Sequence, residues 1–165
     1  MFKELEKIRI GLALVLLCLV FGIGMGVSFG VSEESYQNYI AAGIQAHPQV
    51  HDTKSEEKIW RYAQRAHFHA TGISAFSLGL IILLMFSDLK TKLKSITAIL
   101  IGLSAFYPLA WFTMFLLAPS LGRDAAHEYF LTKLFTAVGV GGLLAGVFIL
   151  AANLFLRLFR EEPGS

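Results

Sequence analysis

Side chains that can bind a metal ion occur at two places in the sequence, each just before a long apolar run. His67 lies in the segment RAHFHATG, residues 65–72. Asp124, His127 and Glu128 precede the last apolar run. Asp124 and His127 are three residues apart, a helical spacing that brings two ligands to one metal, and imidazole suits zinc, copper or iron. These four residues are therefore candidate ligands of a transition metal, and we expect Glu128 to face the interior of a helix bundle.

A haem b group is a second alternative for the same part of the molecule. Two histidines, His67 and His127, could serve as its axial ligands. Arg65 or Arg123 could pair with the propionates, and glycine-rich helix faces would leave room for the macrocycle. Either cofactor would make the chain a redox or metal protein with its site at the outer face of a membrane.

The interpretation that we favour gives these side chains a structural role. Histidine and arginine at a membrane boundary can hydrogen-bond lipid headgroups, cap helices or neutralise Glu128. No nucleophile stands beside a base in a recognisable pattern. Tyr107, Pro108 and Trp111 could line a lipid or quinone pocket, although packing is the more frequent role of such residues. We therefore expect a non-catalytic subunit or binding module of a larger membrane assembly.

Composition indicates that lipid surrounds much of the chain. Of the 165 residues, 55% are hydrophobic and only 16% are charged, against roughly a quarter in soluble domains, and the mean hydropathy is +0.61. A membrane span needs about 20 mostly apolar residues. Four stretches qualify, and we expect membrane helices at about 10–31, 68–87, 95–118 and 131–156. The predicted fold is an all-α integral membrane protein, a four transmembrane helix bundle that forms a single domain over residues 1–165.

Residues 32–66 are predicted to form a small helical cap on the outer side of the membrane. Two glutamates follow Ser32, a pattern that favours a helix start, and Pro48 would end that short helix. Thr53 and the glutamate three residues after it form a capping-box pattern, so the second long helix should begin there. The fourth long helix is expected to begin near Asp124 and to continue through the last apolar run without a break.

The basic residues predict the orientation of the chain. Eight of the 14 lysines and arginines lie in three short segments on the side of the two termini, and six lie on the other side. Because such residues near span ends resist translocation, we expect both termini in the cytoplasm, with a bacterial inner membrane as the setting. The net charge of +2 is too small and too scattered to indicate nucleic acid binding. The expected partners are the lipid bilayer and other membrane subunits or a second copy of the chain.

Two glycine-rich stripes are predicted to pack helices closely or to mediate self-association. Small residues let a neighbouring backbone approach, which is a main route to helix association in lipid. The glycines lie at helical spacing in the first and last spans: Gly22, Gly26 and Gly30, then Gly139, Gly142 and Gly146.

Arg65, Ala66 and His67 open the second span after a long loop. In this the chain resembles the family of small trimeric membrane enzymes that includes the microsomal glutathione transferases. In that family an asparagine and a glutamate follow the Arg-Ala-His motif, at the positions that His69 and Gly72 occupy here, and the third span of this chain contains no arginine. The resemblance implies a trimeric glutathione-transferase-like enzyme as a remote alternative.

Overall fold

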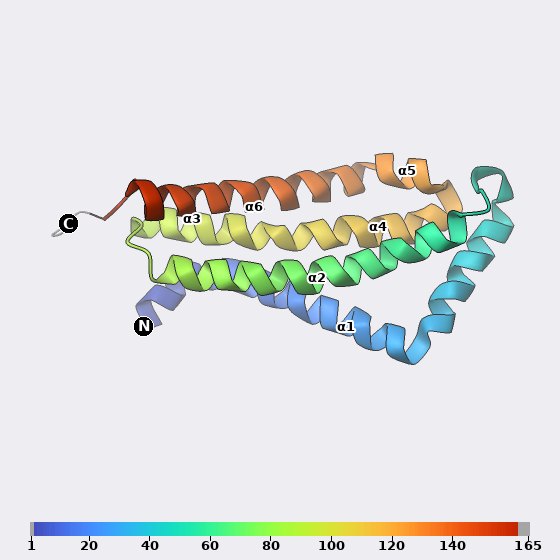
Figure 1. The fold of residues 1–165 in the computed structure, drawn as a ribbon, viewed down its shortest axis with the longest axis horizontal. Helices are drawn as coiled ribbons and strands as arrows, with labels where there is room; N and C mark the ends of the chain where they lie inside the picture. Colours follow the sequence, from blue (N-terminus) through green and yellow to red (C-terminus); the bar gives the residue numbers. More distant parts are fainter. Residues whose placement is uncertain (1, 162–165) are drawn as a thin grey trace.

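The protein is a bundle of long helices. The structure, a computed structural model, describes residues 2–161 (Figure 1). Within this range the chain is helical apart from short connections and one isolated β-bridge between Leu89 and Arg160. The elements are α1 (Phe2–Ala46), the 3-10 turn η1 (Pro48–Val50), α2 (Ser55–Met85), α3 (Thr91–Gly102), the 3-10 turn η2 (Leu103–Ala105), α4 (Phe106–Leu121), α5 (Arg123–Glu128) and α6 (Phe130–Leu156).

Four helical stretches of the described chain are long and apolar enough to cross a membrane. They are Glu4–Ala46, Ser55–Met85, Thr91–Leu121 and Phe130–Leu156, of which the third combines α3, η2 and α4. The predicted all-α, four-helix membrane bundle is therefore confirmed. Such a fold suits a bilayer because each helix satisfies its backbone hydrogen bonds within itself.

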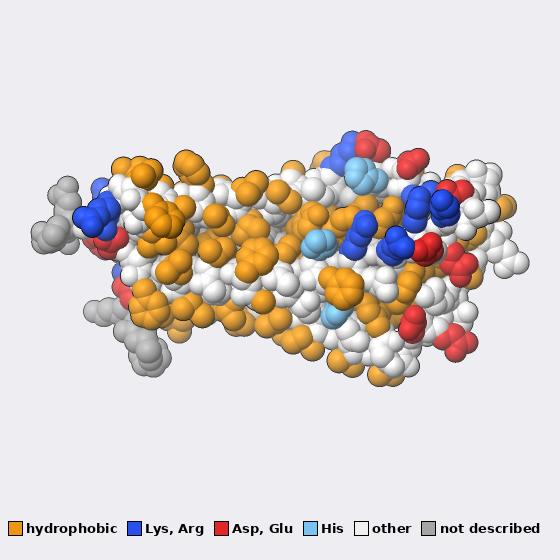
Figure 2. Space-filling model, viewed as in Figure 1, with side chains coloured by type: hydrophobic (Ala, Val, Ile, Leu, Met, Phe, Trp, Pro, Cys, Tyr) orange, Lys and Arg blue, Asp and Glu red, His pale blue; other side chains and the backbone are white. Residues whose placement is uncertain are grey.

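The two ends of the bundle differ in composition. The start of α1 and the end of α6 lie together at one end, and the α1–α2 connection and α5 lie at the other (Figure 1). We call these the terminal end and the cap end, the cap end comprising residues 33–54 and 122–129. Charged and histidine side chains gather over the cap end, whereas the surface nearer the terminal end is largely hydrophobic until charges reappear at its tip (Figure 2).

A kink at Ser32 divides α1 into a long first part and a second part that folds over the cap end. Ser32 has non-helical dihedral angles, φ −144° and ψ 36°, at the residue where the sequence predicts a new helix. Beyond the kink, Ile40 is fully buried and packs with Ile59 and Phe115. The helix ends at Ala46, just before Pro48, whose ring cannot continue it.

The last span is interrupted, and this corrects a prediction. Tyr129 has extended dihedral angles, φ −60° and ψ 140°, so α5 ends at Glu128 and α6 starts at Phe130. The hydroxyl of Thr132 donates a 2.8 Å hydrogen bond across this break to the carbonyl of Ala126. Because the break changes the helical phase, the expectation that Glu128 faces the interior is wrong, and its side chain is 63% exposed.

Close approaches at glycines hold the spans together. A Cβ added at Gly139 would lie 2.5 Å from the backbone nitrogen of Tyr107, and one at Gly146 would lie 2.7 Å from the Ile101 side chain. Gly142 lies against Leu103 in the same way, and Gly22 lies against Ala70 and Thr71. Gly30, by contrast, has open space around it. The shortest such distance among the described glycines is at Gly11 of α1, to the carbonyl oxygen of Ala98 in α3, and Gly102 of α3 lies against Gly11; the predicted stripes include neither glycine.

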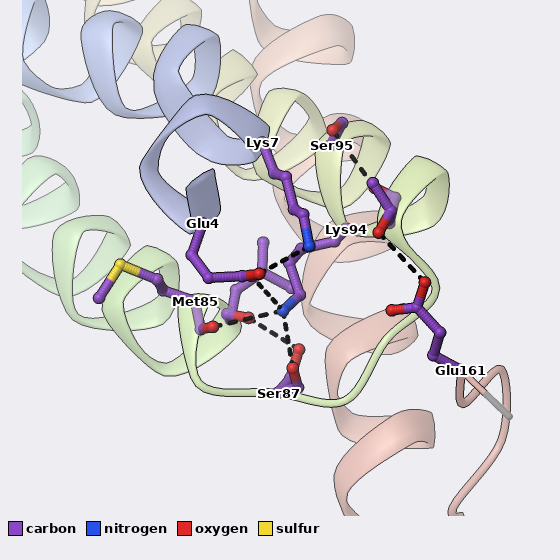
Figure 3. A network of polar contacts seen from close by, with 9 residues as sticks. Glu4, Lys7, Met85, Ser87, Lys94, Ser95 and Glu161 are labelled. Carbon is purple, nitrogen blue, oxygen red and sulfur yellow. Dashed lines mark hydrogen bonds and ion pairs between the residues drawn. The ribbon is translucent and has the colours of Figure 1, made fainter. Parts of the chain in front are cut away.

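A polar network fastens the terminal end (Figure 3). The Lys94 side chain is only 5% exposed, and its ammonium donates hydrogen bonds to the Glu4 carboxylate at 3.0 Å, the Ser87 carbonyl at 2.7 Å and the Met85 carbonyl at 3.3 Å. Lys7 also pairs with Glu4, at 2.6 Å. One lysine thereby joins the start of α1 to the end of α2, where unpaired carbonyls favour a cation.

Candidate functional site

His67 connects α1 to α2. Its Nδ1 lies 2.8 Å from the carbonyl oxygen of Gly22, and because a carbonyl can only accept, this nitrogen donates. The imidazole ring also fills the space beside Gly26, where an added Cβ would lie 2.7 Å from Cε1. Phe29 packs edge-on against it, with ring centroids 5.8 Å apart. These contacts give His67 a structural role, because its side chain joins α2 to α1.

The structure does not assemble the metal ligands that the sequence predicts. His127 and Glu128 contact each other at 3.3 Å, but both are exposed, at 69% and 63%. Asp124 is exposed as well, and His67 contacts α1. Among residues 2–161 no group of three or more histidine, cysteine, aspartate or glutamate side chains is placed to hold a metal. The structure of residues 2–161 thus does not bring the four predicted ligands together.

The residues considered for a haem each have contacts of their own. Arg123 forms an ion pair with Asp52 at 2.8 Å. The guanidinium of Arg65 lies over the Trp111 ring, with Cζ 4.7 Å from its centroid. The two histidines have different surroundings, since His67 packs on α1 whereas His127 is an exposed residue of α5.

A pocket of about 290 Å³ lies between α4 and α6 at the cap end, and we call it the α4–α6 pocket. Residues of α4 and α6 form its walls, and α5 contributes one side chain. The lining residues are Tyr107, Ala110, Trp111, Met114, His127, Thr132, Lys133, Thr136 and Ala137. It combines apolar, aromatic and charged groups around an open volume.

Trp111 is the central aromatic residue of this pocket. The His69 ring stacks on it with a centroid distance of 5.8 Å and an interplanar angle of 19°. His69 also meets the edge of Tyr107 at 4.9 Å. The indole Nε1 of Trp111 is buried, and it has no hydrogen-bond partner within the described residues. Buried polar groups in proteins are nearly always paired, so we expect this N–H group to donate a hydrogen bond to an acceptor from outside the described chain.

The polar groups of the pocket have defined roles as donors or acceptors. The hydroxyls of Thr132 and Thr136 donate to backbone carbonyls at 2.8 Å, so each presents its oxygen as an acceptor. Lys133 pairs with Glu128 at the rim. The hydrogen bond from the Lys133 ammonium, with a further one from His127, lowers the pKa of the Glu128 carboxyl below its ordinary value. Glu128 therefore remains a carboxylate at neutral pH.

A second set of contacts locks the α1–α2 connection onto the end of α4. His51 Nε2 donates a 2.9 Å hydrogen bond to the carbonyl of Pro119. The Asp52 carboxylate accepts bonds from the Ser55 hydroxyl at 2.9 Å and from Arg123 at 2.8 Å. The Ser55 hydrogen bond is the largest cause that lowers the pKa of Asp52 below its ordinary value of 3.8, and Lys54, Arg123 and Lys58 act in the same direction.

Acidification is expected to loosen this connection. A carboxyl whose folded-state pKa is depressed stabilises the fold above its ordinary pKa, and that contribution is lost as the pH falls through the folded-state pKa. The protection of residues 47–54 against hydrogen exchange, corrected for the intrinsic pH dependence of exchange, should therefore fall below about pH 4. The Asp52→Asn variant should exchange faster at neutral pH and show a smaller change with pH. Equal pH profiles for the two proteins would contradict this account.

Sequence reasoning missed much of the pocket. It singled out His127 as a ligand, and Tyr107 and Trp111 as side chains that could line a pocket, but gave no role to Met114 or Lys133. Their side chains meet only because α4 packs on α6, and a single sequence does not state which helices are neighbours. Lys133 gave a weak signal, as a lone charge at the start of an apolar run.

Comparison of the chain with models of known protein families, with curated proteins and with solved structures finds no match. The geometry of residues 2–161 is what indicates a function.

Proposed function

We propose that the protein is a non-catalytic binding module of the membrane, and that the α4–α6 pocket holds an amphiphilic molecule taken from the bilayer. The observation that carries the proposal is the pocket itself. It joins an apolar wall, which includes Met114 and Ala137, to a rim with Lys133 and His127. Ligand sites are commonly concave and mostly apolar, with a few polar groups that fix orientation.

The partners of the titratable groups favour binding over catalysis. Glu128 is neutralised by Lys133 and contacts His127, and all three side chains are exposed. A general base works best with a pKa near the working pH, whereas the pKa of Glu128 is lowered. His69 is stacked on Trp111. These arrangements suit recognition of a ligand better than proton transfer.

The level of the pocket fits an amphiphile. The pocket lies next to α5 of the cap end, and the rest of its lining belongs to the membrane-spanning helices α4 and α6. Lysine, tyrosine and tryptophan are enriched at this level of a bilayer because each has an apolar body and a polar tip. A bound lipid-like molecule would have its polar group near Lys133 and its apolar part between α4 and α6.

The same proposal places the cap end outside and both termini in the cytoplasm of a bacterial inner membrane. Support comes from the basic residues, eight of 14 of which lie in the segments at the terminal end. The module would act within a larger membrane assembly, as a subunit that supplies or senses its amphiphile. Cysteine labelling with an impermeant reagent at exposed Asp124 and Lys92 tests this orientation, which fails if only Lys92→Cys reacts from outside.

Filling the pocket should remove the bound molecule. Ala137 lines the pocket, whereas Ala145 is an exposed residue on the other flank of α6. We expect Ala137→Trp to retain about tenfold less amphiphile than wild type because the indole competes for the same volume, whereas Ala145→Trp should retain the wild-type amount. Native mass spectrometry after mild detergent extraction measures the bound mass directly.

A second filling variant, Thr136→Phe, covers the case in which the indole at position 137 turns toward lipid and leaves the pocket open. Helical content and elution as a single species show that each variant is folded. The proposal fails if both filled variants carry the same bound mass as wild type and Ala145→Trp.

A further inference from the structure

We propose that the ligand of the α4–α6 pocket is an anionic amphiphile, an acidic phospholipid whose phosphate lies beside Trp111 and Arg65. This inference rests on the proposed function, and it adds the chemical class of the ligand. It follows from three features of the site: which polar groups lack a partner, what charge surrounds the pocket, and where the apolar surface continues.

The unpartnered groups beside the pocket are hydrogen-bond donors. The indole nitrogen of Trp111 can only donate, and it is buried without an acceptor in the described chain. A guanidinium also can only donate, and Arg65 forms no ion pair with a carboxylate of the described residues. A ligand that satisfies both must offer oxygen acceptors, as a phosphate does.

A positive charge lies beside the pocket. The guanidinium of Arg65 contacts the face of the Trp111 ring, which places its charge 4.7 Å from the ring centroid. Glu128 is the carboxylate at the rim, and Lys133 neutralises it. The Arg65 charge thus remains available, and Arg65 pairs with phosphate in two-point geometry more readily than a lysine would.

An apolar surface continues from the pocket toward the terminal end. On α6, Val140 and Leu144 follow Lys133 at helical spacing, so they lie on the pocket side of the helix. Their side chains are 38% and 63% exposed. An acyl chain can lie along this surface while the phosphate stays at the level of Trp111. A free phosphate ion would leave this surface unused.

The test compares two lipids that share their acyl chains and their phosphate but differ in the rest of the headgroup, so that one is net anionic and the other zwitterionic. Purified protein is given an equal mixture of phosphatidylglycerol and phosphatidylcholine with identical acyl chains, and native mass spectrometry counts the bound lipids. Wild type should prefer phosphatidylglycerol by about tenfold, because the choline cation of phosphatidylcholine offsets the attraction of Arg65 for the phosphate. Arg65→Gln should lose most of this preference. The matched control Arg61→Gln, which removes an exposed arginine paired with Glu57 one turn away, should retain it.

Two further measurements address the hydrogen bond and the acyl chain. Trp111→Phe keeps an aromatic ring and removes the donor, so the amount of phosphatidylglycerol bound should fall about threefold. Inorganic phosphate at millimolar concentration should not displace phosphatidylglycerol, because the acyl chain supplies part of the affinity. Displacement by phosphate would overturn the assignment of an amphiphile.

The outcomes separate this inference from the proposal beneath it. If wild type binds both lipids equally and Ala137→Trp loses both, the pocket binds an amphiphile but the anionic assignment is wrong. The assignment is also wrong if Arg65→Gln keeps the full preference. If Ala137→Trp binds both lipids as wild type does, the proposed function fails as well.

Discussion

Replacing Gly11 with alanine is expected to lower the free energy of unfolding by at least about 3 kcal/mol, the upper range for overpacking a dense interior. A Cβ at this position would overlap the carbonyl group of Ala98. The partner glycine cannot give way, because a Cβ at Gly102 would itself lie 2.8 Å from the Gly11 Cα. The variant should therefore give little monodisperse protein after extraction, with a lower thermal midpoint in detergent.

The matched control for this effect is Gly24→Ala on the same helix. Gly24 is exposed and has no atom within 4 Å of an added Cβ. Alanine is the better helix former by about 1 kcal/mol, so this variant should be as stable as wild type or more stable. The two substitutions are chemically identical and are expected to act in opposite directions. Equal thermal midpoints would show that α1 and α3 do not cross at Gly11.

Replacing Lys94 with alanine is expected to destabilise the terminal end by about 2–3 kcal/mol, since it leaves several groups without their charged partner. The ammonium contacts Glu4, which is 36% exposed, so solvent screens part of that ion pair. The bond to the Ser87 carbonyl is buried, and it carries more of the effect. Thermal unfolding in detergent measures the loss.

Lys92→Ala serves as the control because Lys92 lies in the same turn and is exposed. It should unfold at the wild-type temperature. The Lys94→Ala variant should also expose the start of α1 to proteases, because Lys94 joins Glu4 to the end of α2 (Figure 3). A Lys94→Ala protein as stable as Lys92→Ala would mean that the network does not hold the terminal end.

The fold was predictable because the signals for a membrane helix are local. A run of about 20 apolar residues marks a span wherever its neighbours lie. The kink at Ser32 was predictable for the same reason, since a serine followed by two glutamates marks a helix start. The break at Tyr129 carried no such signal, because neither proline nor glycine stands there. The prediction continued one helix through Tyr129, and it therefore gave the Glu128 side chain an inward orientation that the structure does not show.

The candidate site was less predictable because it depends on contacts between spans. The periodicity of α2 indicated a small, polar face for His67, and in the structure this residue contacts Gly22 and Gly26 of α1. That α1 would supply the partner could not be read from α2 alone. Likewise, Trp111 and Lys133 belong to one pocket only because α4 packs on α6. Among the glycines, Gly30 matched the stripe but has open space, whereas Gly11 lies outside the stripe and makes the closest approach.

The central claim, that the α4–α6 pocket holds a membrane amphiphile, is tested most directly by photo-crosslinking in native membranes. A benzophenone amino acid is placed at Thr136, inside the pocket, or at Ala145, on the other flank of α6. After irradiation, mass spectrometry of the purified protein identifies what is attached. The account predicts one dominant lipid-sized adduct at position 136 and a mixture that reflects bulk lipid at position 145. Identical adducts at the two positions, or a protein partner alone at position 136, would contradict it.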